Sequence, residues 1–130
     1  MRKIRKYLDL LFKISNFIII ILYLYPGSIF GWILYKNLKS QPQLTGDFLS
    51  LSSNHLYTFL ILSFIAILSY SNNSKKLNYI FLYLLLISII LELAHLIIPN
   101  RSFQFEDLIG NITGVIVSYI LIKFYEFIRR

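Results

Sequence analysis

The stretch from Leu77 to Ile98 reads LNYIFLYLLLISIILELAHLII and decides the fold of this chain. A membrane-spanning helix needs about 20 predominantly apolar residues to cross roughly 30 Å of hydrocarbon. The stretch meets that length, and Glu92 is its one acidic residue. Its apolar residues run continuously instead of alternating, which excludes a strand of a membrane β-barrel. The stretch is therefore predicted to be a membrane-spanning α-helix.

Three further apolar runs predict three more spans. They cover residues 7–25, 55–70 and 108–128, and polar segments separate them. The expected fold class is therefore all-α, an integral membrane bundle of about four transmembrane helices that forms a single domain over residues 1–130. A shorter apolar piece, residues 28–35, cannot span the bilayer. The sequence leaves open whether this piece extends the first helix past a kink, re-enters the membrane or lies at its surface.

The overall composition also indicates a membrane protein. Hydrophobic residues make up 57% of the chain and charged residues 15%, and the mean hydropathy is +0.67. A soluble domain carries about a quarter charged residues. Because a chain of 130 residues has a large surface for its volume, it cannot hide this excess of apolar side chains in a core. The chain has no cysteine, which excludes a disulfide framework and a thiolate metal site.

The basic residues predict the orientation, because lysine and arginine are retained on the cytoplasmic side of membranes. With four spans, ten basic residues fall on one side and three on the other. The ten are Arg2, Lys3, Arg5, Lys6, Lys13, Lys75, Lys76, Lys123, Arg129 and Arg130, and the three are Lys36, Lys39 and Arg101. Both termini are therefore expected in the cytoplasm. Topology and contact with anionic lipids then explain the net charge of +7, and no nucleic-acid partner is expected.

Polar residues inside the predicted spans are the candidates for function, since charges in a bilayer are costly and mostly face the bundle interior. Glu92 and His95 lie three residues apart and so share one helical face. A second stripe, on the last helix, consists of Asp107, Asn111, Gly114 and Ser118, at spacings of four, three and four residues.

The predicted topology brings these groups to a common depth. At 1.5 Å per residue, Glu92 lies about 9 Å and His95 about 4.5 Å below the outer end of their helix. Asn111 lies about 4.5 Å below the same surface, because its helix runs inward. His55 begins an inward-going helix there, and Arg101 is in the connecting outer loop. A polar cluster is therefore expected in the outer leaflet.

The stretch from Glu92 to Gly114, ELAHLIIPNRSFQFEDLIGNITG, resembles the signature of VanZ-like membrane proteins. That signature has a glutamate followed by a glutamine, then a proline and an arginine, and then an aspartate, an asparagine and a glycine. His55 matches the histidine that opens the second helix of the family. The resemblance covers residues 51–119, about half of the chain.

Two positions depart from the family pattern. His95 stands where the family usually has glutamine, and Leu51 and Ser52 stand where an aspartate and a lysine usually precede the histidine. The resemblance implies a multi-pass protein of the bacterial cytoplasmic membrane and an accessory role in the cell envelope. The founding member of the family is associated with low-level teicoplanin resistance, and most relatives have no established biochemical activity.

Three functions are compatible with the predicted cluster. The function expected is binding of an anionic lipid or glycan headgroup by Arg101, Asp107, Asn111, His95, Glu92 and His55, with the Arg101 guanidinium on phosphate. In a structural alternative, Glu92 pairs with Arg101 and Asp107 caps the last helix. In a third, an enzyme acts on a lipid-linked phosphate with His55 or Glu92 as general base. The chain has no nucleophile motif and no glycine-rich phosphate loop, which disfavours the enzyme.

No metal or other cofactor is expected. Glu92 and His95 are spaced to bind a metal from one helical face, but two histidines and no cysteine make a poor ligand set. Gly110 and Gly114 form a G-x-x-x-G pattern, which permits close helix packing within the chain or in a homo-oligomer. Candidate partners are membrane lipids, a lipid-linked glycan precursor and proteins of envelope synthesis.

Overall fold

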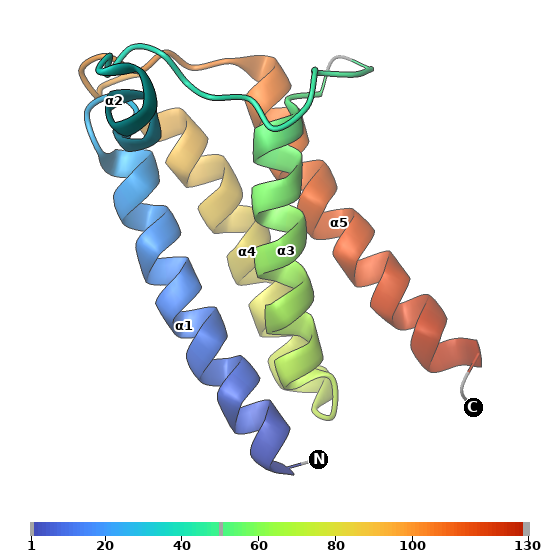
Figure 1. Ribbon diagram of the computed structural model, residues 1–130. Coiled ribbons are helices and arrows are strands. Elements are labelled where there is room, and N and C mark those ends of the chain that lie inside the picture. The colour runs from blue at the N-terminus through green and yellow to red at the C-terminus, as the bar shows by residue number, and fades with distance from the viewer. Residues whose placement is uncertain (1, 50, 129–130) are drawn as a thin grey trace.

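In residues 2–49 and 51–128, which the computed structural model describes, the chain forms five α-helices and no strand (Figure 1). The helices are α1 (Arg2–Leu24), α2 (Ile29–Tyr35), α3 (Ser53–Tyr70), α4 (Ser74–Ala94) and α5 (Phe105–Ile128). In this part of the chain all helices except α2 are long and apolar enough to cross a membrane. The prediction of an all-α bundle with four membrane-spanning helices is confirmed.

The four long helices alternate in direction, so the bundle has two distinct ends (Figure 1). One end, which we call the loop end, carries α2 and the segments 36–49, 51–52 and 95–104. The other end, which we call the terminal end, carries the start of α1, the turn at 71–73 and the last turn of α5. Arg129 and Arg130, which belong to the predicted cytoplasmic charges, lie outside the described residues.

Helix α3 is the centre of the bundle and contacts α1, α4 and α5. The main apolar core consists of Phe12, Tyr23, Phe59, Leu62, Ala66, Leu84, Leu91 and Val115. Many apolar side chains point outward instead, and Phe17 on α1, for example, is 65% exposed. Helices with an apolar outer surface are stable in lipid, where a soluble protein would bury such groups.

Two glycines allow α5 to lie against the backbone of α3. A β-carbon placed on Gly114 would be 2.5 Å from the carbonyl oxygen of Leu56 and 2.7 Å from the amide nitrogen of Leu60. One placed on Gly110 would be 2.8 Å from the carbonyl oxygen of Ser52. The G-x-x-x-G face therefore packs against a helix of the same chain.

Several helix ends differ from the predicted spans, and two of these differences affect the loop end. Helix α4 ends at Ala94, four residues before the expected limit at Ile98. Beyond Ala94 the backbone tightens into turns that are closed by hydrogen bonds to the carbonyl three residues earlier. Pro99 disfavours a helical conformation in the residue before it, and Asn100 has a positive φ of 59°. Helix α5 begins at Phe105, three residues earlier than expected.

The short helix α2 is separate from α1 and does not continue it past a kink. The hydroxyl of Ser28 accepts a hydrogen bond from the amide of Gly31 and caps the start of α2, and Lys36 ends the helix in the left-handed conformation. Figure 1 shows α2 nearly end-on beside the end of α1, so it lies across the loop end. A β-carbon on Gly31 would be 1.6 Å from the carbonyl oxygen of Ser40, so the following segment packs directly on α2.

The orientation of the bundle is testable because the chain contains no cysteine. Single cysteines at Gln43 and Gln104 lie on exposed positions of the loop end, and one at Ser74 lies on an exposed position of the terminal end. In intact cells, we expect an impermeant maleimide to label the first two and not the third. Labelling after lysis is the control for reactivity. Labelling of Ser74→Cys alone would place the loop end in the cytoplasm.

Candidate functional site

The loop end contains a cluster formed by His55, Glu92 and Asp107. His55 is in the first turn of α3, Glu92 in the last turn of α4 and Asp107 in the first turn of α5. The Nδ1 atom of His55 lies 3.7 Å from Oε2 of Glu92, and its Nε2 atom lies 3.4 Å from Oδ2 of Asp107. Three successive helices therefore place one imidazole between two carboxyl groups.

His95 supports this cluster from the end of α4. Its Nε2 atom is 3.1 Å from the carbonyl oxygen of Tyr23, and its Nδ1 atom is 3.3 Å from Oε1 of Glu92. Because a carbonyl oxygen only accepts, Nε2 carries a proton. Its Nδ1 atom then faces Oε1 of Glu92. The ring of His95 also stacks on that of Tyr23, with centroids 5.7 Å apart.

Asn111 connects α5 to the same network. The Tyr23 hydroxyl donates to Oδ1 of Asn111 at 2.9 Å, and the Nδ2 group of Asn111 donates to the carbonyl of Ser88 at 3.4 Å. The Tyr23 oxygen is also 3.0 Å from Nδ1 of His55. Tyr23 thus joins α1 to the cluster, and it is not among the site residues predicted from the sequence.

Both nitrogens of the His55 ring face oxygen atoms. Nδ1 faces the Tyr23 hydroxyl, Oδ1 of Asn111 at 3.2 Å and Oε2 of Glu92, and Nε2 faces Asp107. Since Tyr23 donates its proton to Asn111, each of these oxygens presents lone pairs to the ring. Such surroundings suit an imidazolium, which donates from both nitrogens, or a neutral ring with a cation bound on one side.

The cluster is deeply buried. Glu92 and Asn111 are fully inaccessible, His95 and His55 nearly so, and the Asp107 side chain is 14% exposed. Oε1 of Glu92 accepts from the backbone amide of Gln104 at 3.3 Å, in addition to its contact with His95. Within the described part of the chain, no hydrogen bond reaches Oε2 of Glu92. Such an unpaired oxygen is uncommon among buried polar atoms.

Arg101 binds backbone carbonyls instead of a carboxylate. Its Nη2 group donates to the carbonyl of Leu22 at 2.8 Å and its Nε group to that of Tyr25 at 3.3 Å. Leu22 is in the last turn of α1 and Tyr25 directly follows the helix, so Arg101 caps α1 at its negative end. Among the residues the structure describes, Arg101 forms no ion pair, and the expected pairing with Glu92 is wrong. Burial lowers the pKa of Arg101 while the Tyr23, Glu92 and Asp107 groups oppose that shift, and the guanidinium stays charged at neutral pH.

The expected role of Asp107 as the N-terminal cap of the last helix is also wrong. Helix α5 begins at Phe105, so Asp107 lies inside its first turn, where a negative charge still favours the positive end of the helix. This position turns the carboxylate toward His55 on α3.

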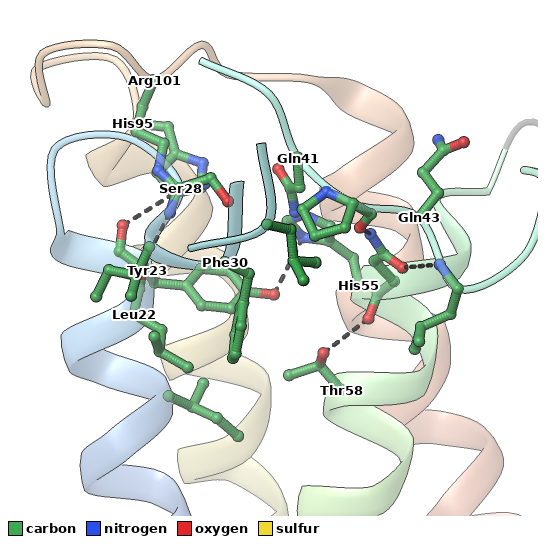
Figure 2. A pocket seen from close by; sticks show the side chains of 16 residues that line it. Leu22, Tyr23, Ser28, Phe30, Gln41, Gln43, His55, Thr58, His95 and Arg101 are labelled. Atoms are coloured by element: carbon green, nitrogen blue, oxygen red, sulfur yellow. Dashed lines mark hydrogen bonds between the residues drawn. The ribbon is translucent and has the colours of Figure 1, made fainter. Parts of the chain in front are cut away.

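A pocket of about 420 Å³ opens beside the cluster, between α1, α2, α3 and the segment 41–44 (Figure 2). Its apolar wall consists of Ile19, Leu22, Ile29, Phe30, Leu34, Pro42 and Leu44, and its polar wall includes Gln41, Gln43, Asn54 and Thr58. Figure 2 shows Tyr23 reaching across from α1 toward His55.

The six predicted ligand residues divide between the pocket and the interior. His55, His95 and Arg101 line the pocket. Glu92, Asp107 and Asn111 lie behind them and do not line it; Asn111 and Glu92 contact the pocket residues through hydrogen bonds or close polar contacts. The pocket therefore presents imidazole and guanidinium groups, with the carboxyl groups as their second layer.

The fold and the site together define a class of protein, a four-span membrane protein with a buried polar cluster and an adjoining pocket at one end. A family model described as VanZ/LLP1 matches residues 10–127. Because this match covers most of the chain, the protein belongs to the VanZ/LLP1 family, and the resemblance predicted from residues 92–114 is confirmed. Comparison with curated proteins and with solved structures gave no match.

Proposed function

We propose that this protein is a cell-envelope accessory factor that binds a lipid with an anionic headgroup, or a lipid-linked glycan, at its loop end. In this proposal the loop end faces the outer side of the bacterial cytoplasmic membrane. The observation that carries the proposal is the pocket, which has an apolar wall and a polar wall that includes Arg101. Its volume of about 420 Å³ lies in the range of pockets for small ligands.

The apolar wall fits a hydrocarbon chain. Ile19 and Leu22 on α1 face Ile29 and Phe30 on α2 across the pocket, and none of these side chains carries a polar atom. A lipid chain is already in an apolar environment in the bilayer, so this wall contributes packing contacts with the chain. This wall favours an amphiphile over a free sugar or a free phosphate.

The polar wall fits the phosphate of a headgroup. A guanidinium has five N–H donors, and the two hydrogen bonds to α1 use two of them. The others can bind phosphate oxygens. The ring nitrogens of the neighbouring His55 and His95 already face oxygens of the cluster, so Arg101 is the donor that this wall offers to a phosphate. The structural alternative, in which the cluster only holds the helices together, predicts no selective ligand.

A pair of tryptophan substitutions on α1 tests the pocket. Leu22 lines it, whereas its neighbour Ile21 is exposed on the outer face of α1. We expect Leu22→Trp to fill the pocket and to lower the amount of bound phosphatidylglycerol about tenfold, a loss of about 1.4 kcal/mol. Ile21→Trp, the matched control, should bind as the wild type does. Native mass spectrometry of the purified protein measures both.

The headgroup is tested by comparing phosphatidylglycerol with phosphatidylethanolamine, which has no net charge. Arg101→Gln keeps two amide donors but removes the charge, so the preference for the anionic lipid should disappear. Equal binding of both lipids by the wild type, unchanged in Leu22→Trp, would favour the structural alternative.

If the ligand site supports the envelope, both Leu22→Trp and Arg101→Gln should also raise teicoplanin sensitivity at unchanged protein abundance.

A further inference from the structure

We propose that His55, Glu92 and Asp107 bind one divalent transition-metal cation. One ligand atom from each residue lies within 4.8 Å of the other two. The three residues come from the loop-end turns of three different helices, so the site would hold α3, α4 and α5 together. This proposal stands apart from lipid binding, because a cation can be bound and measured without added lipid.

The distances suit ligands of a common ion. Two ligands of a tetrahedral cation, each about 2.0–2.1 Å from it, lie about 3.3 Å apart. The nitrogen-to-oxygen distances in the cluster are 3.4 Å to Asp107 and 3.7 Å to Glu92. Both are long for a hydrogen bond but close to the separation of neighbouring metal ligands. These two distances run to different nitrogens of His55, so a single ion would bind one of the nitrogens. One carboxylate would then have to move toward it, starting from ligand atoms that lie within 4.8 Å of one another.

The second observation is the state of Glu92. Its Oε1 atom is already occupied by the amide of Gln104 and by His95. Its Oε2 atom is fully buried, accepts no hydrogen bond from the described residues and is directed at the ring of His55. A buried carboxylate oxygen without a partner is costly, and a cation between Glu92 and His55 accounts for its position.

The chemistry of the ligand set indicates the kind of cation. One imidazole nitrogen favours zinc over magnesium and calcium, which prefer oxygen ligands alone, while the two carboxylates also suit manganese. Two carboxylates and a neutral imidazole also balance the charge of a divalent ion, which matters in a site of low dielectric constant. The rival occupant is a proton on His55, which leaves the two carboxylates with one positive charge between them.

His95 and Asp107 give the site features that metal sites share. His95 holds Oε1 of Glu92 and is itself fixed by the carbonyl of Tyr23, as groups around metal ligands commonly are. The partial exposure of Asp107 and the position of His55 on the pocket wall provide access from the loop end. With three protein ligands, a cation would keep at least one open coordination position.

The test is a titration of tag-free protein, treated with EDTA and dialysed, with Zn²⁺ and with Mn²⁺ in separate experiments. We expect one of these ions to bind at one equivalent per chain by calorimetry, to remain after desalting by elemental analysis and to raise the melting temperature. Asp107→Asn should weaken this binding at least about tenfold, because even substitutions of groups that only contact metal ligands weaken metal binding by that factor. Glu126→Gln changes a carboxylate on the same helix, which pairs with Lys123, and should bind as the wild type does.

The titration of the wild type decides the proposal without any variant. If neither ion binds stoichiometrically, the proposal is overturned and a proton is the occupant of the cluster. If an ion binds but Asp107→Asn and Glu92→Gln bind it equally well, the proposed ligands are wrong. Should Glu92→Gln fail to fold, Asp107→Asn carries the comparison, since its side chain lies at the edge of the core. Loss of cation binding with retained lipid binding would separate the two proposals.

Discussion

Gly114→Ala is expected to lower the free energy of unfolding by about 3 kcal/mol, near the upper limit for overpacking a close-packed interior. The added methyl would lie 2.5 Å from the carbonyl oxygen of Leu56 and 2.7 Å from the amide nitrogen of Leu60. Both are backbone atoms of α3, so no side chain can rotate away and the two helices must separate. Thermal melting by circular dichroism in one detergent measures the loss.

Two further alanine variants calibrate this result. Gly110→Ala should lower the free energy of unfolding by less, since the closest atom to its added methyl is the carbonyl oxygen of Ser52, at 2.8 Å. Gly46→Ala should have little effect, because no atom lies within 4 Å of an added β-carbon there. If Gly114→Ala has the same melting temperature as the wild type, the close approach of α5 to α3 does not contribute to the stability of the bundle.

Glu92→Ala is the second change with a large expected effect. It should lower the free energy of unfolding by about 3–5 kcal/mol, which is typical when one partner of a buried charged pair is removed. The substitution removes the acceptor of the Gln104 amide and of His95, and it leaves His55 without one of its two carboxyl neighbours. It also leaves a cavity in a fully buried position. Melting in the presence of EDTA measures this loss without a contribution from metal ions.

Glu92→Gln separates the shape of this side chain from its charge. The amide oxygen can still accept from Gln104, and its volume matches, so most of the stability should return. Glu126→Gln, at the terminal end, is the control for loss of a carboxylate and should change stability by less than about 0.5 kcal/mol. Equal melting of Glu92→Ala and the wild type would contradict a structural role for Glu92.

The membrane-spanning helices were predictable because each leaves a continuous apolar run in the sequence. The meeting of His55, Glu92, Asp107 and Asn111 was also predictable in outline. It follows from helical periodicity, which groups residues on one face, and from antiparallel helices, which bring the ends of different spans to one level.

Other parts of the site have no signal in the sequence. Tyr23 is one of ten tyrosines, and its place at the end of the first span is equally typical of a residue at the membrane surface. The partners of Arg101 are backbone carbonyls, which every residue has, so no sequence pattern marks them. The sequence therefore predicts a carboxylate as the partner of this guanidinium. The role of Asp107 depends on where α5 begins. Because the helix begins three residues earlier than predicted, Asp107 lies inside its first turn and next to His55 instead of capping the helix.

Helix α1 is the least buried of the four long helices. In the apolar stretch that would span the membrane, 11% of its residues are buried inside the protein, against 50% for α3. At the loop end, however, Tyr23 and the carbonyls near it are fixed by His55, His95 and Arg101. The wall that would receive a hydrocarbon chain includes Ile19 and Leu22, which lie beside this fixed end of α1, and the rest of α1 is mostly exposed to lipid. A site of this construction would be selective for headgroups and tolerant of chain length, so that lipids with one headgroup and different tails would compete on equal terms.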